Sequence, residues 1–322
     1  MPPRKPQIRC ALLMAALLTW LAGCASTPEP DVRYRPAESV LEVLAVLRRH
    51  VPDDTYRFEP GQDFTGRNVY RSSLLRMESL ERVHAESLRA TQMEGVIAFA
   101  KGRALERLRA FDLAAEEYRL AAELDRELAV EAGRSADLCE ALHDTTRLSI
   151  DLDVLADQVG LDSDANSALG GFEQRSGRLT SLERVAEGTH HVFVVREELE
   201  RTDMARAEYF VALRQILPDG DVRAAAELQR LVTRHRESKY INRHILAMAE
   251  LYEELAVEYV DANPPESLHF DPVRFQELIE ATSRLYEVVA GQDGKPEKLE
   301  AARRLEAFLA FALRVDRDRF MP

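Results

Sequence analysis

From Arg71 to the end of the chain, apolar residues recur at the three- and four-residue spacing that forms one face of a helix. Alanine, leucine, glutamate and arginine dominate this region, and candidate strands are very few. We therefore predict an all-α protein in which antiparallel helix pairs stack into an array. The predicted helices run near 72–90, 92–110, 112–125, 128–142, 145–159, 189–217, 221–236, 239–261, 271–290 and 295–316.

Helix-breaking residues stand between the predicted helices of the C-terminal array, residues 189–322. The breakers are Pro218-Asp219-Gly220, Asn263-Pro264-Pro265 and Gly291-Gln292-Asp293-Gly294. Residues 161–188 contain Gly170, Gly171 and Gly177 and have the weakest helical pattern. We expect a weakly ordered or irregular connection there, which divides the helices of residues 92–160 from the C-terminal array.

The N-terminal part, residues 37–91, begins with one more predicted helix over 37–50. An irregular segment over 51–70 follows, since Pro52, Pro60, Gly61 and Gly66 interrupt any regular pattern. A long aromatic loop in a helical protein suggests either a specific contact with a partner or a cover folded back over the first helices. The candidate partner-binding residues of this loop are Tyr56, Phe58, Phe64, Arg67 and Tyr70.

Small and large apolar residues alternate across two predicted helices between Ala98 and Arg126. The pattern resembles a tetratricopeptide (TPR) repeat in five positions, namely Gly102, Phe111, Ala114, Tyr118 and Ala121. The resemblance implies that small residues let the two helices approach while large ones fill the groove between them. Ala98 and Arg126 depart from the pattern, where the family usually has tryptophan and proline, so the copy is degenerate.

A second stretch, Ala205 to Glu254, resembles the same family through a helix, the Pro218-Asp219-Gly220 turn and a further helix pair. The resemblance implies a TPR-like solenoid or array over 92–160 and 189–322. An irregular helical bundle remains the alternative, because amphipathic helices rich in alanine and leucine mimic such repeats.

The N-terminus combines three basic residues with the eleven-residue apolar stretch Ala11–Leu21. This stretch is too short to span a bilayer, which requires about twenty apolar residues in a helix. Leu21-Ala22-Gly23-Cys24 closes this stretch and resembles the lipobox of bacterial lipoproteins. The resemblance implies that residues 1–23 are a signal peptide and that Cys24 carries acyl chains. Ala25, in place of the aspartate that retains enteric lipoproteins at the inner membrane, implies an outer-membrane protein that faces the periplasm.

Residues 24–36 are expected to tether the domain to the lipid, because Pro28, Pro30 and Pro36 favour an extended chain. Removal of residues 1–23 takes away Arg4, Lys5 and Arg9 and no acidic residue, so the net charge would move from −13 to −16. This acidity disfavours nucleic acid as a partner.

Cysteine usage excludes an internal disulfide in the mature chain. Cys10 would leave with the signal peptide and Cys24 would carry lipid, so Cys139 would stand alone. Its apolar helical neighbours predict a buried small side chain rather than a reactive thiol.

Catalytic motifs are not found in the sequence, so we expect no enzyme, no catalytic residue and no cofactor. His190 and His191 follow Thr189, a candidate N-cap, and begin a helix in which His191 and Glu198 are two turns apart, so both could face one ion. Metal sites need three or four converging ligands. We therefore expect cap and surface roles, and no metal.

A helical array also presents a concave face on which arginine and tyrosine side chains bind peptides. The candidates there are Arg103, Arg107, Tyr209, Arg243 and Tyr252. We expect a lipid-anchored scaffold for envelope proteins or peptides, in envelope assembly or export. The alternative is a glycan- or peptide-binding lipoprotein.

Overall fold

The computed structural model describes residues 35–50, 69–148 and 161–319. Within these ranges the chain forms eleven α-helices and no strand, which confirms the predicted all-α array. The helices are α2 Pro36–His50, α3 Val69–Ala90, α4 Glu94–Arg107, α5 Phe111–Leu124, α6 Ala129–Thr146, α7 Leu161–Ala186, α8 His191–Leu213, α9 Gly220–Arg234, α10 Ile241–Ala262, α11 Pro272–Ala290 and α12 Lys298–Asp318.

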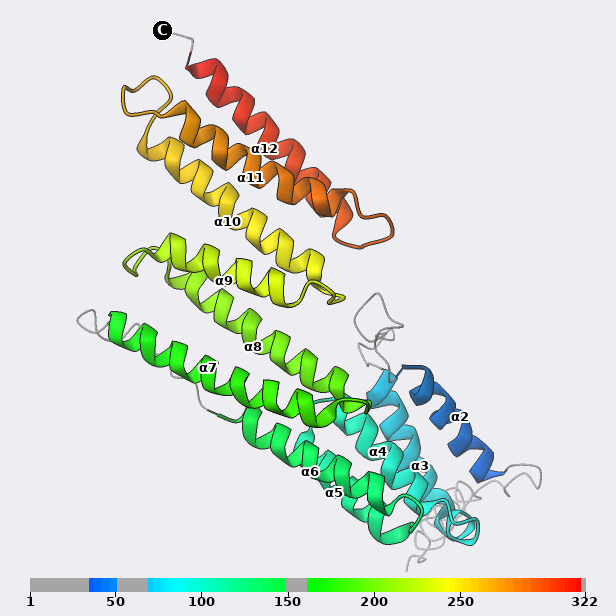
Figure 1. Ribbon diagram of the computed structural model, residues 1–322. Coiled ribbons are helices and arrows are strands. Elements are labelled where there is room, and N and C mark those ends of the chain that lie inside the picture. Colours follow the sequence, from blue (N-terminus) through cyan, green and yellow to red (C-terminus); the bar gives the residue numbers. More distant parts are fainter. Residues whose placement is uncertain (1–34, 51–68, 149–160, 320–322) are drawn as a thin grey trace, which may run out of the picture.

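The helices stack side by side in chain order, from α2 at one end to α12 at the other (Figure 1). Each helix contacts the next, and α2 also contacts α4, α6 contacts α8, and α10 contacts α12. The apolar core is accordingly a series of local clusters between neighbouring helices. This arrangement is typical of helical arrays, in which each unit is stabilised by its neighbours. Among the described helices, none combines the length and apolarity needed to cross a bilayer.

The close approach of α4 and α5 depends on a glycine opposite a tyrosine. A Cβ atom added at Gly102 would lie 2.9 Å from the Tyr118 ring, well inside van der Waals contact. Tyr118 is fully buried, and its ring meets that of Phe99 edge-on at 5.1 Å between centroids. Ala114 and Ala121, on the same helix as Tyr118, are also fully buried. Small residues thus admit the neighbouring helix, and one large ring fills the remaining space.

The prediction of an irregular connection over 161–188 is wrong for residues 161–186, which form α7. Glycine lowers helix propensity by about 1 kcal/mol, but tertiary packing overrides that preference here. Phe172, which follows Gly171, and Leu179, which lies two residues after Gly177, are both buried. A Cβ at Gly170 or Gly177 would touch nothing, so these glycines mark no close contact.

Tyr70 belongs to α3, not to the loop predicted over 51–70. Its side chain is 1% exposed and lies in the cluster that contains Val40 and Leu47 of α2. The prediction that Tyr70 contacts a partner is therefore wrong, because the ring is part of the core. The other candidates of that loop, Tyr56, Phe58, Phe64 and Arg67, lie outside the described residues, as do Cys24 and most of the helix predicted over 145–159.

The turn between α8 and α9 forms where Pro218-Asp219-Gly220 predicts it. Asp219 has a positive φ of 51°, and a Cβ at Gly220 would overlap the Arg214 carbonyl oxygen. Only glycine avoids that overlap. The Arg214 guanidinium is buried and donates to Asp221 at 2.9 Å and to Glu258 of α10, so it joins three helices.

Candidate functional site

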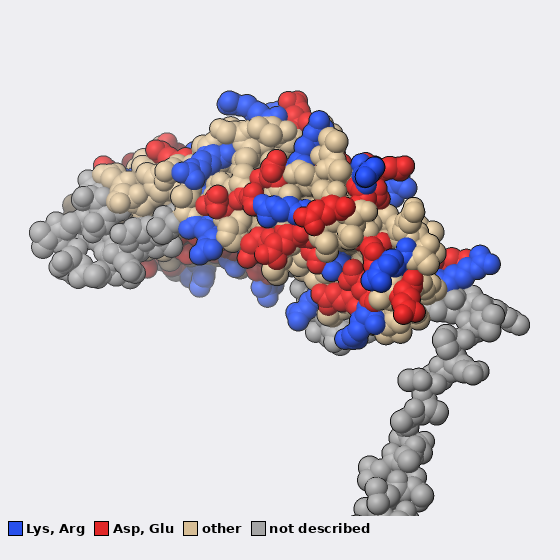
Figure 2. Space-filling view, turned by 90° about the horizontal axis from the view of Figure 1, so that it is seen from below, with Lys and Arg blue, Asp and Glu red and all other residues tan. Residues whose placement is uncertain are grey.

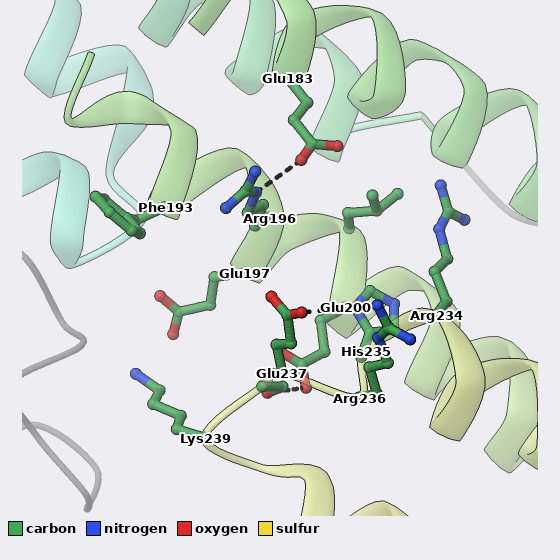
Figure 3. Close-up of a pocket in the computed structure, with 12 residues that line it drawn as sticks. Glu183, Phe193, Arg196, Glu197, Glu200, Arg234, His235, Arg236, Glu237 and Lys239 are labelled. Atoms are coloured by element: carbon green, nitrogen blue, oxygen red, sulfur yellow. Dashed lines mark hydrogen bonds and ion pairs between the residues drawn. The ribbon is translucent and has the colours of Figure 1, made fainter. Parts of the chain in front are cut away.

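A cleft of about 550 Å³ opens where the end of α7, the first half of α8 and the segment after α9 meet (Figure 3). Charged side chains of both signs surround it, together with the phenyl ring of Phe193. The lining residues are Glu183, Phe193, Arg196, Glu197, Leu199, Glu200, Arg234, His235, Arg236, Glu237, Ser238 and Lys239.

The rim of the cleft is exposed and internally paired. Arg196 of α8 donates to Glu183 of α7 at 2.7 Å while more than half of its side chain faces solvent. Arg236 and Glu237, in the segment after α9, form a loose pair at 3.8 Å and are 79% and 89% exposed. Exposed pairs of this kind are weak, about 0–1 kcal/mol. Their charges are therefore available to a ligand with little loss of folding free energy.

Glu197 is a fixed acidic group in the cleft wall. Its carboxylate accepts from Arg107 of α4 at 2.9 Å and from Arg201 at 2.9 Å, and the Arg107 side chain is only 4% exposed. Burial would raise the pKa of Glu197, but the positive charges of Arg107, Lys239 and Arg201 hold it below its usual value. The carboxylate is thus ionised at neutral pH and connects α8 to the N-terminal half of the array.

A buried acid of α8 fixes the end of α9, where the far wall of the cleft begins. Asp203 is 1% exposed and accepts from Arg230 at 3.1 Å, from Arg234 at 3.0 Å and from His235 at 2.9 Å. Burial would raise the pKa of Asp203, but the hydrogen bond from His235 and the two arginine charges lower it.

A second acid of α8, Glu200, fixes the segment that follows α9. Glu200 lies 2.6 Å from His244 Nε2 of α10 and accepts a 2.5 Å hydrogen bond from the Ser238 hydroxyl. Two buried acids of one helix therefore fix the far wall of the cleft.

Replacement of Asp203 by asparagine should lower the free energy of unfolding at pH 7 by about 2 kcal/mol, because it removes the buried carboxylate on which Arg230, Arg234 and His235 converge. The pKa of Asp203 is lower in the folded chain than the 3.8 of the free side chain, so this stabilisation is complete above pH 3.8 and is lost as pH falls through the folded value. Urea unfolding at pH 7 and at pH 3 measures the difference. The account would be contradicted if Asp203→Asn lowered the free energy of unfolding equally at both pH values. It would also be contradicted if the exposed control Asp293→Asn lowered it as much as Asp203→Asn does.

A second cluster of ionisable groups is buried where α4, α5, α6 and the start of α8 meet. Glu106 is 1% exposed, and its Oε2 atom accepts a 2.8 Å hydrogen bond from the Tyr118 hydroxyl. The same oxygen lies 3.3 Å from His190 Nε2 and 3.1 Å from His191 Nδ1. The other ring nitrogen of His191 lies 3.0 Å from the Ser135 hydroxyl. Three of these side chains therefore converge on one carboxylate oxygen.

Electrostatics in this cluster favour an ionised Glu106. Burial would raise its pKa, but the nearby histidines hold it well below the usual value. Burial and the charge of Glu106 raise the pKa of Tyr118, so its hydroxyl remains a donor. Burial lowers the pKa of His190. The carboxylate is thus ionised, and the Tyr118 hydroxyl donates to it.

The expected cap and surface roles are wrong for His191, whose side chain is 4% exposed. The alternative in which His191 and Glu198 face one ion does not hold either. Glu198 accepts two hydrogen bonds from Arg109, at 2.6 and 2.8 Å, while His191 faces Glu106. The local sequence does not distinguish Glu106 from other acidic residues, except that it lies one turn after Gly102 on the inner face of α4. Cys139 is fully buried and burial raises the pKa of its thiol, which confirms the predicted small apolar role.

The three arginines among the concave-face candidates are each engaged within the array. Arg107 is buried against Glu197 behind the cleft, Arg103 lies over the Phe99 ring, and Arg243 pairs with Glu297 of the segment before α12. Sequence reasoning missed the cleft wall formed by residues 234–239, since a short charged turn carries no signal of its own. Comparison with known proteins gives no match to a family model, a curated protein or a solved structure.

Proposed function

We propose that this protein is a lipid-anchored scaffold whose helical array binds a segment of another envelope protein in the cleft between α7, α8 and the segment after α9. The observation that carries the proposal is the cleft itself, in which exposed charges of both signs flank the partly buried Phe193 (Figure 3). A polypeptide segment offers matching charges and apolar side chains along one extended strand, and TPR-like arrays bind such segments.

The rigidity of the cleft supports a binding role. Asp203 and Glu200 fix the segment after α9, and Glu197 ties the opposite wall to α4 through Arg107. A preformed wall spares a ligand part of the ordering free energy on binding. Figure 2 shows basic and acidic side chains interspersed on the face it presents, with no field of a single sign. Such a surface suits a protein of mixed charge better than a polyanion.

Lipid attachment at Cys24 and an outer-membrane location facing the periplasm belong to the same proposal. They rest on the resemblance of Leu21-Ala22-Gly23-Cys24 to the lipobox and on Ala25. The proline-containing tether would then place the helical array near the membrane surface. Glycan binding by the aromatic loop is the alternative, and the burial of Tyr70 against α2 weighs against it because that ring is 1% exposed and packed in the core.

Chemical crosslinking in intact cells, followed by purification of the full chain and identification of attached protein, tests the scaffold proposal. Phe193→Ala and Arg236→Glu should each lower the yield of the main protein adduct about tenfold. The first removes an aromatic anchor, and the second reverses a charge and so places like charges together in the interface. The matched control is Arg274→Glu, an arginine of α11 that is 61% exposed and pairs with Glu277.

Both cleft variants should keep the wild-type helical signal in circular dichroism. Recovery of the same adduct in equal yield from the cleft variants and the control would contradict the cleft as the binding site. Recovery of glycan without any protein would contradict the scaffold function and favour the alternative.

A further inference from the structure

The buried cluster around Glu106 has the donor set of a transition-metal site. Within the described residues, Glu106, His190 and His191 each offer one ligand atom, and these three atoms all lie within 4.8 Å of one another. Two imidazoles and one carboxylate are ligands that Zn²⁺ accepts, and three protein ligands leave one coordination position for water or a further donor.

The separations of the ligand atoms fit one ion. Four ligands placed tetrahedrally at about 2.0–2.1 Å from Zn²⁺ lie about 3.3 Å from one another. Glu106 Oε2 lies 3.3 Å from His190 Nε2 and 3.1 Å from His191 Nδ1. Both separations from Glu106 Oε2 therefore match those of two ligands on one ion, and the ligand atoms of the two histidines lie within 4.8 Å of each other.

His191 supplies an independent observation. Its side chain is 4% exposed, and its Nδ1 atom is buried without a hydrogen-bond partner although it points toward the Glu106 carboxylate. When Nε2–H donates to the Ser135 hydroxyl at 3.0 Å, Nδ1 carries a lone pair that faces a carboxylate oxygen. Two acceptors in such contact repel each other unless a proton or a cation lies between them. The Ser135 contact would thus orient His191 as a ligand.

We infer that Glu106, His190 and His191 form a zinc site that links α4 to the start of α8. Tyr118, which donates to Glu106 Oε2 at 2.8 Å, would hold the carboxylate in place. The positive charge of Arg103 is felt at His190 and would repel a bound cation. The Arg103 guanidinium itself lies over the Phe99 ring, 5.6 Å from the ring centroid. The site would join the helices before α7 to those after it, so zinc should stabilise the whole array.

The test uses the full chain purified in detergent and freed of metal with a chelator, with Zn²⁺ and Co²⁺ as probes. We expect calorimetry to give one equivalent of Zn²⁺ per chain with a micromolar Kd or tighter, and zinc to raise the Tm. Co²⁺ should give the intense visible bands of a tetrahedral site. The cobalt spectrum needs no variant, so it remains decisive if a substituted chain fails to fold.

The variants Glu106→Gln and His190→Gln should each weaken zinc binding by about 100-fold or more, since each removes a ligand. Glutamine at position 106 retains an acceptor for the Tyr118 hydroxyl, and the His190 side chain is 12% exposed, more than that of His191. The matched control His269→Gln changes an exposed histidine in the segment between α10 and α11 and should bind zinc as the wild type does. A wild-type chain without tetrahedral cobalt bands, or a zinc affinity that is equal in the wild type and the Glu106→Gln variant, would overturn the site.

Discussion

Replacement of Tyr118 by alanine should lower the free energy of unfolding by about 4 kcal/mol or more, because it removes a large ring from a fully packed position. The ring is 0% exposed and fills the space that Gly102 leaves between α4 and α5. Neighbouring helices cannot close the cavity without moving, since Phe99 already packs edge-on against the same ring. Loss of the hydroxyl would also remove the 2.8 Å hydrogen bond from Tyr118 to the buried Glu106.

Two further variants separate the contributions of the ring and the hydroxyl. Tyr118→Phe keeps the ring and should destabilise by only about 1–2 kcal/mol, the effect of a lost buried hydrogen bond to a charged group. Leu113→Ala, at a half-exposed position on the outer face of the same helix, should have a smaller effect than Tyr118→Ala. Urea unfolding followed by far-ultraviolet circular dichroism gives all three values. A Tyr118→Ala chain as stable as the Leu113→Ala chain would refute the packing argument.

Replacement of Cys24 by alanine should abolish incorporation of labelled palmitate and move the protein out of the membrane fraction. Each buried methylene of an acyl chain contributes about 0.8 kcal/mol, so loss of all chains removes the anchor entirely. The helical fold should be unchanged, because the array begins after the tether. Membrane fractionation and radiolabel counting measure the two effects.

The control for this experiment is Cys10→Ala, which changes the other N-terminal cysteine and should leave labelling intact. The Cys24→Ala protein could stay in the membrane fraction because its leader is not cleaved. A second chain, in which a cleavable secretory signal replaces residues 1–24, removes that explanation and should not be found in the membrane fraction. Labelled Cys24→Ala protein, or membrane-bound protein from the second chain, would mean that Leu21-Ala22-Gly23-Cys24 is not a lipobox.

The helices were predictable wherever periodicity and breakers agreed. The turn at Pro218-Asp219-Gly220 is an example, because the φ of Asp219 and the crowding at Gly220 are local properties that the sequence displays. Helix α7 was not predictable in the same way. Its three glycines weaken the local pattern, and only burial against neighbouring helices stabilises it.

The contacts that build the candidate sites are long-range and could not be predicted. Glu106 and His190 are 84 residues apart, and Arg109 and Glu198 are 89 apart. On an isolated helix each of these acids looks like any solvated carboxylate. The tertiary arrangement that brings the end of α4 near the start of α8 decides which acid meets a histidine and which meets an arginine.

Site-specific photocrosslinking at the cleft tests the central claim most directly. A benzophenone amino acid in place of Phe193 keeps an aromatic side chain in the cleft, and the same probe in place of Val222 reports on an outer position of α9 that is 70% exposed. In living cells, the account predicts a discrete adduct with an envelope protein from position 193, weakened by Arg236→Glu and not formed from position 222. Equal adducts from both positions, or no protein adduct from position 193, would contradict it.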